Sequence, residues 1–251
     1  AWRCWSAWPG RAGRERLAEV YRSYLDVGAQ YGLPMVVLSP TWRANPERVR
    51  LAGLAGVEVV NWDGVRFLAA LRDQCGAYGR QVWIGGLMGC RGDAYQPSEA
   101  LPAQEAHAFH AAQAAALAWA GADFLMGATL PALSEAKGMA WAMAETGLPY
   151  LLSFVVLASG TLLDGTSLDE AMAIIDHELA SPPAAYMINC VHPLVFERAV
   201  ARLRSRERLI GLQANTSPKP PQELDHAAEL QGEAPTVFAE TPLVDPRIPH
   251  R

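Results

Sequence analysis

One complete strand–helix–strand unit can be read in residues 123–156, DFLMGATLPALSEAKGMAWAMAETGLPYLLSFVV. Its two ends, residues 123–129 and 150–156, are almost wholly apolar, as is typical of short strands that are buried on both faces. Residues 134–146 between them are rich in Ala, Met, Glu and Lys, which favour helix, and Gly147 suits the position after a helix end. Two strands joined by a helix predict a parallel pair.

The same alternation continues on both sides of this unit. Further apolar runs predict strands at residues 35–39, 82–87, 185–190 and 209–215, and helical patterns occupy residues 14–31, 103–120, 167–179, 193–204 and 222–231. Strands that alternate with helices predict an α/β fold with a parallel sheet. We expect a single domain over residues 1–251, built as a (β/α)8 TIM-type barrel that is incomplete, since only six units are visible. An open doubly wound sheet is the alternative, although no glycine-rich dinucleotide turn accompanies it.

Composition excludes several classes of protein. Apolar residues make up 51% of the 251 residues and charged residues 19%, so the chain can bury a large core. The net charge is −5 and no long basic run occurs, which argues against a nucleic-acid partner. No apolar stretch reaches the roughly 18 residues that a membrane span requires. The cysteines, at positions 4, 75, 90 and 190, form no CxxC pair, so we expect reduced thiols and a cytoplasmic protein.

Polar residues gather where the predicted strands end, which is where parallel barrels carry their sites. Cys190 ends one strand beside Asn189, so its thiol could be a metal ligand, a nucleophile or a buried small hydrophobe. His192 could be catalytic or could cap the next helix. His107 and His110 lie on one helix with Glu105, but barrel helices face outward, so we expect a solvated surface there and not a metal site.

Four segments carry a resemblance to a known family. They read HAAQAAALAWAGADFLMGATLPALSEA (residues 110–136), PYLLSFVVLASGTLLD (149–164), YMINCVHP (186–193) and IGLQANTS (210–217). In this order they resemble the homocysteine S-methyltransferase family, over about residues 17–239.

The resemblance implies a barrel with zinc at its mouth, where the metal holds the homocysteine sulfur as a thiolate. That thiolate attacks a methyl group on a positively charged sulfur or nitrogen donor. Cys190 matches the first zinc ligand of the family. Asn189 and Thr129 would then shape the pocket, and Asp93 would contact the substrate. The expected partners are a small-molecule thiol and a methyl donor.

The sequence also departs from the family pattern. The adjacent cysteine pair of a Gly-Gly-Cys-Cys element is absent, as is an early Asp-Gly-Gly element. Where relatives place a glutamate that holds the substrate amino group, this chain has Ala128. Cys190, His192 and Cys90 form a conceivable substitute ligand set. The alternatives are a non-catalytic barrel homologue that binds a small molecule or partner, and an unrelated barrel enzyme that uses Asp93, Asp164 or His192. Open sheet edges would need cover, which makes a homo-oligomer possible.

Overall fold

The computed structural model describes residues 10–54, 56–219, 221–224, 228–229 and 231–240. The chain divides into two compact units. Unit 1 comprises Ala1–Met88 with Ala112–Leu125, and unit 2 comprises Gly89–Ala111 with Met126–Arg251.

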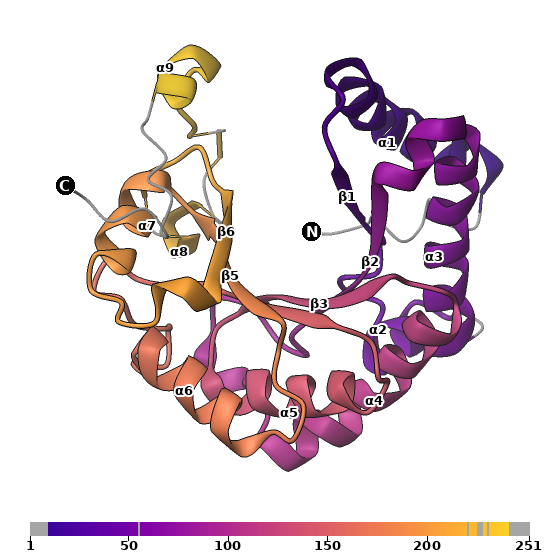
Figure 1. The fold of residues 1–251 in the computed structure, drawn as a ribbon. Helices are drawn as coiled ribbons and strands as arrows, with labels where there is room; N and C mark the ends of the chain where they lie inside the picture. The colour runs from indigo at the N-terminus through magenta and orange to yellow at the C-terminus, as the bar shows by residue number, and fades with distance from the viewer. Residues whose placement is uncertain (1–9, 55, 220, 225–227, 230, 241–251) are drawn as a thin grey trace. The chain divides into compact units, whose positions relative to one another are not determined.

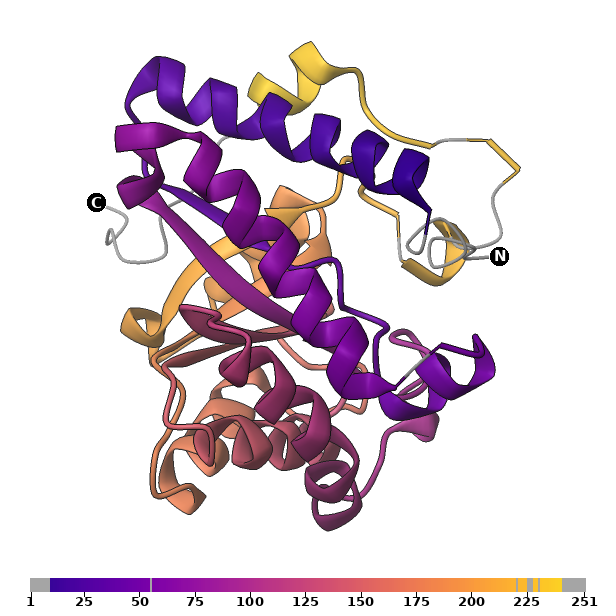
Figure 2. The ribbon, with the colours of Figure 1, turned by 90° about the vertical axis from the view of Figure 1, so that its right-hand side faces the viewer.

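Unit 1 places two long helices over two parallel strands. Its elements are α1 (Arg11–Tyr31), β1 (Met35–Leu38), α2 (Pro46–Leu51), α3 (Val57–Gln74), η2 (Gly76–Gln81) and β2 (Val82–Gly89). Val37 of β1 is in register with Ile84 of β2, and both side chains are buried. Helices α1 and α3 cross in front of these strands (Figure 2), and the Tyr21 and Phe67 rings meet edge to face at 5.9 Å. Apolar side chains of α1 and α3 thus cover one face of β1 and β2.

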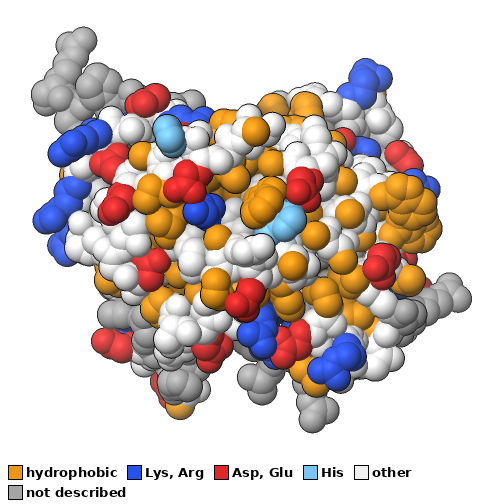
Figure 3. Space-filling model, turned by 90° about the horizontal axis from the view of Figure 1, so that it is seen from below, with side chains coloured by type: hydrophobic (Ala, Val, Ile, Leu, Met, Phe, Trp, Pro, Cys, Tyr) orange, Lys and Arg blue, Asp and Glu red, His pale blue; other side chains and the backbone are white. Residues whose placement is uncertain are grey.

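Unit 2 continues the strand and helix alternation. Its elements are η3 (Pro97–Glu99), the first half of α4 (Ala103–Trp119), β3 (Phe124–Leu130), α5 (Leu133–Ala144), β4 (Tyr150–Phe154), α6 (Leu168–Glu178), β5 (Ala185–Val191), α7 (Pro193–Val200), η4 (Arg206–Arg208), β6 (Leu209–Ala214), α8 (Pro221–Leu224) and α9 (Pro235–Glu240). Helices α5 and α6 lie side by side on the same face of the strands (Figure 1). Figure 3 shows charged side chains of both signs scattered among apolar ones.

The six predicted strands and their parallel pairing are confirmed. The strand order β1-β2-β3-β4-β5-β6 follows the sequence, and the boundary between the units passes through β3. Pairing is parallel wherever the register is defined, for example Ser153 with Met187 and Ile188 with Leu212. The fold is therefore α/β with a six-stranded parallel sheet, and closure into eight strands stays a prediction. No helix within the described residues is long and apolar enough to cross a membrane.

Burial of the strands differs from the expectation. Strands β3 and β4 are buried along nearly their whole length. In β1 and β2, however, the paired Val36 and Trp83 are each 56% exposed, and Ile210 of β6 is 47% exposed. The continuous apolar runs predicted that every strand is buried on both faces. This prediction was wrong for the strands at or next to the ends of the strand order. These strands are more exposed because fewer neighbouring strands cover them.

Two helical regions also differ from the sequence prediction. Helix α3 was missed, although buried positions such as Val57, Val60, Leu68 and Leu71 recur at helical spacing. Of the helix expected at residues 222–231, the structure has only the short α8, and residues 225–227 and 230 lie outside the described part.

Candidate functional site

The polar residues that matter most lie at the carboxyl ends of three consecutive strands of unit 2. Thr129 is the last but one residue of β3, Ser153 lies in β4, and Asn189 and Cys190 lie near the end of β5. Strands that run parallel bring their carboxyl ends to one edge, so these side chains can meet there. We call Thr129, Ser153, Asn189 and Cys190 the strand-end cluster.

The side-chain amide of Asn189 holds the cluster together. Its Oδ1 accepts hydrogen bonds from the Thr129 backbone N–H at 3.0 Å and from the Ser153 hydroxyl at 2.7 Å. Its Nδ2 donates to Thr129 Oγ1 at 2.7 Å and to Cys190 Sγ at 3.1 Å. Two donors and two acceptor positions are all that an amide offers, so these four bonds use the whole capacity of Asn189. The buried amide therefore fixes its neighbours and is not free to bind a ligand.

Backbone strain is concentrated in the same cluster. Thr129 has φ 61° and Cys190 has φ 59°, and among the described residues they are the only ones other than glycine with positive φ. The left-handed region costs an L-residue about 1–2 kcal/mol, and a β-branched threonine there is a genuine outlier. Strain of this kind persists only where surrounding contacts impose it, and it is commonest at functional sites. Here the Asn189 side chain bonds both strained residues, at the Thr129 backbone N–H and hydroxyl and at the Cys190 thiol.

Cys190 is an extra residue in its strand. The register of β5 with β6 pairs Asn189 with Gln213 and then Val191 with Ala214, which leaves Cys190 unpaired as a β-bulge. A bulge redirects a side chain, and bulges are common beside active sites. The thiol of Cys190 lies 4.0 Å from Thr129 Oγ1, and the residue is only partly buried. Its sulfur is thus contacted by Asn189 and Thr129 in a residue that is only partly buried.

The other described cysteines are different. Cys90 is 1% exposed, and its thiol donates to the Gly92 carbonyl at 3.6 Å, as expected for a loop thiol. Cys75 follows α3, and its thiol donates to the Leu71 carbonyl. Burial raises the pKa of the Cys75 thiol, and the nearby Asp26 raises it further. Cys4 lies outside the described residues. Of these thiols, only that of Cys190 ends a strand beside other polar groups.

Comparison with known proteins gives the family. The sequence model of the homocysteine S-methyltransferase family matches residues 2–241, which is nearly the whole chain. The chain belongs to the homocysteine S-methyltransferase family. A search of curated proteins returned no match.

Crystal structures of the homocysteine methyltransferase MmuM from Escherichia coli share the fold of this family member. The oxidized form has a TM-score of 0.66 at 22% identity, with 82% of each chain covered. The metallated form has a TM-score of 0.62 at 21% identity, with 82% of this chain and 81% of the other covered. The apo form has a TM-score of 0.57 at 20% identity with the same coverage. At these identities the likeness shows the fold alone.

The described residues of this homocysteine S-methyltransferase homologue do not fit a zinc site. No group of three or more His, Cys, Asp or Glu side chains that could hold a metal occurs in the part of the chain that the structure describes. Cys190, His192 and Cys90 therefore do not form the conceivable substitute ligand set. His192 uses Nδ1 to accept the Leu194 backbone N–H and Nε2 to contact Glu233, both at 3.2 Å, so it caps α7. Cys190 as a single metal ligand stays a prediction.

The side-chain and N–H hydrogen bonds of Asp93 join it to its own loop and not to the strand-end cluster. It sits half-buried in the loop after β2, where its Oδ1 accepts the Tyr95 backbone N–H at 2.8 Å and its own N–H donates to Glu99. The structure thus brings Thr129, Asn189 and Cys190 together, and it places Asp93 in a neighbouring element of the same unit.

Sequence reasoning missed Glu135 and misplaced His110. Both side chains are fully buried, with His110 Nε2 3.0 Å from Glu135 Oε1. The expectation of an outward-facing histidine was wrong because this part of α4 packs against α5. An acidic residue inside the otherwise apolar stretch of α5 was the available signal. His107 does lie nearer the surface, stacked on Trp141 at 4.0 Å and bonded to Glu145 at 2.9 Å.

Proposed function

We propose that this chain transfers a methyl group from a sulfonium or quaternary ammonium donor to a thiol of the homocysteine type, at the strand-end cluster. The observation that carries this proposal is the bulged, partly exposed Cys190, whose sulfur is fixed by Asn189 beside Thr129. Membership of the homocysteine S-methyltransferase family supports the same reaction.

The reaction asks for orientation more than for acid–base groups. A bond forms between the acceptor sulfur and the methyl carbon while the bond from that carbon to the positively charged donor atom breaks. The electron pair of the broken bond stays on the donor atom, which becomes neutral, and the acceptor thiol releases its proton to solvent. Holding the two reactants in line can supply much of the rate enhancement. The rigid, strained backbone at Thr129 and Cys190 suits this requirement, because a fixed wall orients the acceptor better than a mobile one.

For zinc we propose only that the Cys190 thiolate is one of its ligands. Because the described residues supply one thiol and no complete ligand set, no step is derived through the metal. A cytoplasmic, reducing setting is proposed as well, since Cys75, Cys90 and Cys190 are all free thiols.

The test is an assay of the purified protein with homocysteine and either S-methylmethionine or betaine, with methionine measured by mass spectrometry. We expect methionine with one of the two donors, and a loss of at least about 100-fold in kcat/KM, some 2.7 kcal/mol, in Cys190→Ser. Cys75→Ser is the matched control, because it removes a partly buried thiol from the other unit.

Bound zinc is measured in the same samples. Zinc present in the native protein and lost in Cys190→Ser would support a ligand role, and an equal content in both would exclude it. Methionine formation that is unchanged in Cys190→Ser would contradict the assigned site.

A second candidate is a non-catalytic homologue that binds a small molecule or a partner. Two observations favour it. Ala128, where relatives carry a glutamate, is buried with 4% exposure, and the described residues hold no metal group. To separate the candidates, the protein is incubated with thiols that carry an amino group and with thiols that lack one, and both methyl transfer and binding are measured. Methyl transfer to any of these thiols would exclude the non-catalytic candidate. Binding of a thiol without methyl transfer would support it.

A further inference from the structure

Glu135 is a buried carboxylate that the proposed chemistry does not use. It lies in the first turn of α5 with an exposed fraction of 0%. Its Oε1 accepts the Arg91 backbone N–H at 2.6 Å and lies 3.0 Å from His110 Nε2, and its Oε2 accepts the Leu101 backbone N–H at 3.2 Å. One carboxylate thus collects three donors from two segments that are distant in sequence.

The two backbone donors are the two ends of one loop. Residues 91–101 leave the carboxyl end of β2 and return toward α4, and Glu135 holds both ends. Inside the loop, Asp93 accepts the Tyr95 N–H, and Glu99 accepts the Asp93 N–H, each at 2.8 Å. A compact loop of this length with joined ends is an Ω-loop, a type that is often functional. The loop is ordered by its own bonds, and its position depends on Glu135.

The surroundings of Glu135 are built for close approach. A Cβ at Gly138 would lie 2.1 Å from the Ala103 carbonyl oxygen, so only glycine lets α5 pack this tightly on the start of α4. Against an ionised carboxylate, Nε2 of His110 must be the donor. His110 Nδ1 is buried without a hydrogen-bond partner in the described structure, so the ring is engaged through Nε2 alone. Burying a carboxylate costs much free energy unless hydrogen bonds compensate for it. The bonds of Glu135 to the two ends of the loop therefore matter for the stability of this region.

We propose that Glu135 is a positioning residue that holds the 91–101 loop so that the Asp93 carboxylate meets the positive charge of the methyl donor. This inference rests on the proposed function. The loop follows the carboxyl end of a parallel strand, where sites lie in such folds, and it belongs to the same unit as the strand-end cluster. Asp93 is half-buried; its carboxylate accepts the Tyr95 backbone N–H through Oδ1, and its backbone carbonyl accepts the Gln96 N–H at 3.2 Å. A sulfonium and a quaternary ammonium group both carry the charge that a carboxylate would attract.

The test compares Glu135→Gln, Asp93→Asn and the double variant. In Glu135→Gln the new side-chain amide presents an NH2 group to one of the two backbone N–H donors, so it can hold only one end of the loop. We expect a rise of about 10-fold in KM for the donor in each single variant, with kcat changed less than about twofold. Because Glu135 acts through Asp93, the double variant should be no worse than either single variant.

Hydrogen exchange followed by mass spectrometry reports on the loop itself. Glu135→Gln should exchange faster at residues 91–101 while the strands of unit 2 stay protected. Glu145→Gln is the matched control, since it neutralises a more exposed carboxylate at the end of the same helix. It should leave both the loop and KM unchanged.

Several outcomes would overturn the proposal. These are unchanged exchange of the loop in Glu135→Gln, additive effects in the double variant, and an unchanged KM in Asp93→Asn. This last variant is at a half-buried loop position, so it remains informative if Glu135→Gln does not fold. Absence of methyl transfer in every form would overturn the proposed function and the role of Asp93, whereas faster exchange confined to the loop would still support the hold of Glu135 on it.

Discussion

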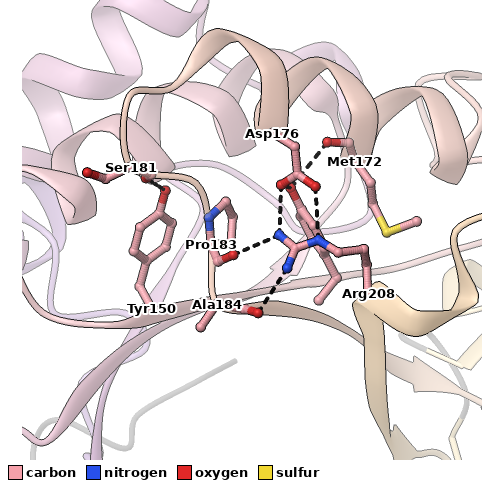
Figure 4. A network of polar contacts seen from close by, with 8 residues as sticks. Tyr150, Met172, Asp176, Ser181, Pro183, Ala184 and Arg208 are labelled. Atoms are coloured by element: carbon pink, nitrogen blue, oxygen red, sulfur yellow. Dashed lines mark hydrogen bonds and ion pairs between the residues drawn. The ribbon is translucent and has the colours of Figure 1, made fainter.

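Polar side chains of unit 2 link neighbouring strands both at their carboxyl ends and at their amino ends, and the two groups differ in charge and in backbone conformation. At the carboxyl ends, the strand-end cluster uses an uncharged amide, Asn189, and holds two residues in strained backbone conformations. At the amino ends, Asp176 of α6 accepts the Tyr186 hydroxyl at 2.8 Å and forms a bidentate pair with Arg208, through Nε at 2.9 Å and one NH2 group at 2.8 Å. We call Asp176, Tyr186 and Arg208 the ion-pair network (Figure 4).

The ion-pair network shows no sign of strain. Arg208 also donates to the Ala184 and Pro183 carbonyls (Figure 4). Its guanidinium lies 5.3 Å from the Tyr186 ring centroid. None of its members has positive φ. Bidentate pairs of this kind fix α6, β5 and the start of β6 to one another.

The difference indicates that the two ends of the strands have different roles. In parallel α/β folds the amino ends of the strands serve stability, and the carboxyl ends carry the site. A site tolerates strain because the strain keeps side chains where chemistry needs them, and the rest of the structure must supply the stability to hold it. The following predictions test this division.

The largest expected effect is on stability, at the ion-pair network. Asp176→Ala removes the only carboxylate that Arg208 pairs with in the described structure, and it leaves the Tyr186 hydroxyl only the longer bond to the Met172 carbonyl, at 3.3 Å. We expect the free energy of unfolding to fall by about 2–3 kcal/mol, less than for a fully buried pair because both charges keep some contact with water. Urea unfolding measures this. Methyl transfer, assayed well below the unfolding midpoint, should stay within about twofold.

Glu178→Ala is its matched control. It removes a carboxylate from the same helix, but from the more exposed pair with Lys137, and should cost less than about 0.5 kcal/mol. If Asp176→Ala abolished transfer without lowering stability, the division between the two ends would be wrong.

The second prediction concerns pH. Burial and the hydrogen bond to Asp176 raise the pKa of Tyr186 well above the value of about 10 for free tyrosine. The folded protein thus keeps this proton while the unfolded chain loses it, so the contribution of Tyr186 is complete below pH 10 and declines as pH rises further. Relative to Tyr186→Phe, the native protein should lose about 1.4 kcal/mol between pH 9 and pH 11.

Unfolding in urea at each pH gives the comparison. Tyr24→Phe, at a position with 65% exposure, should show no such change with pH. A constant difference between the native protein and Tyr186→Phe over this range would mean that Tyr186 is not held in its neutral form by the network.

The smallest expected effect isolates the strain at Cys190. Glycine adopts positive φ freely, so Cys190→Gly should be more stable than Cys190→Ala by about 1 kcal/mol, the reverse of the usual order. Thermal unfolding measures the difference. The same pair of substitutions at Cys90, where φ is not positive, should favour alanine. An advantage of alanine at both positions would show that Cys190 carries no strain.

Much of the fold followed from local pattern. Apolar runs such as residues 123–129 and 150–156 predicted the strands, and their separation by helices predicted parallel pairing. Helix α3 was missed because its buried positions include Asn61 and Gly64, which lower the apolar signal. Exposure of Val36, Trp83 and Ile210 could not be predicted, because it depends on which strands lie at or next to the ends of the sheet.

The candidate site was predicted in part. Placing Thr129, Asn189 and Cys190 at strand ends required only the strand boundaries and the parallel topology. Their mutual hydrogen bonds, the bulge at Cys190 and the two positive φ values depend on the register between strands, which no local pattern contains. The role of Glu135 depends on α5 meeting the 91–101 loop, a contact between segments more than 30 residues apart.

By itself, the sequence determined the class of fold, the family and the strand ends at which polar residues gather, because hydrophobic periodicity and short motifs are local properties of the chain. Only the tertiary structure decided that the Asn189 amide uses all of its donors and acceptors in bonds to Thr129, Ser153 and Cys190. It also decided that Cys190 forms a bulge with positive φ. It also decided that a buried carboxylate closes the loop of Asp93. The physical reason is that hydrogen bonds between strands, and the strain they impose, exist only once distant segments have packed together.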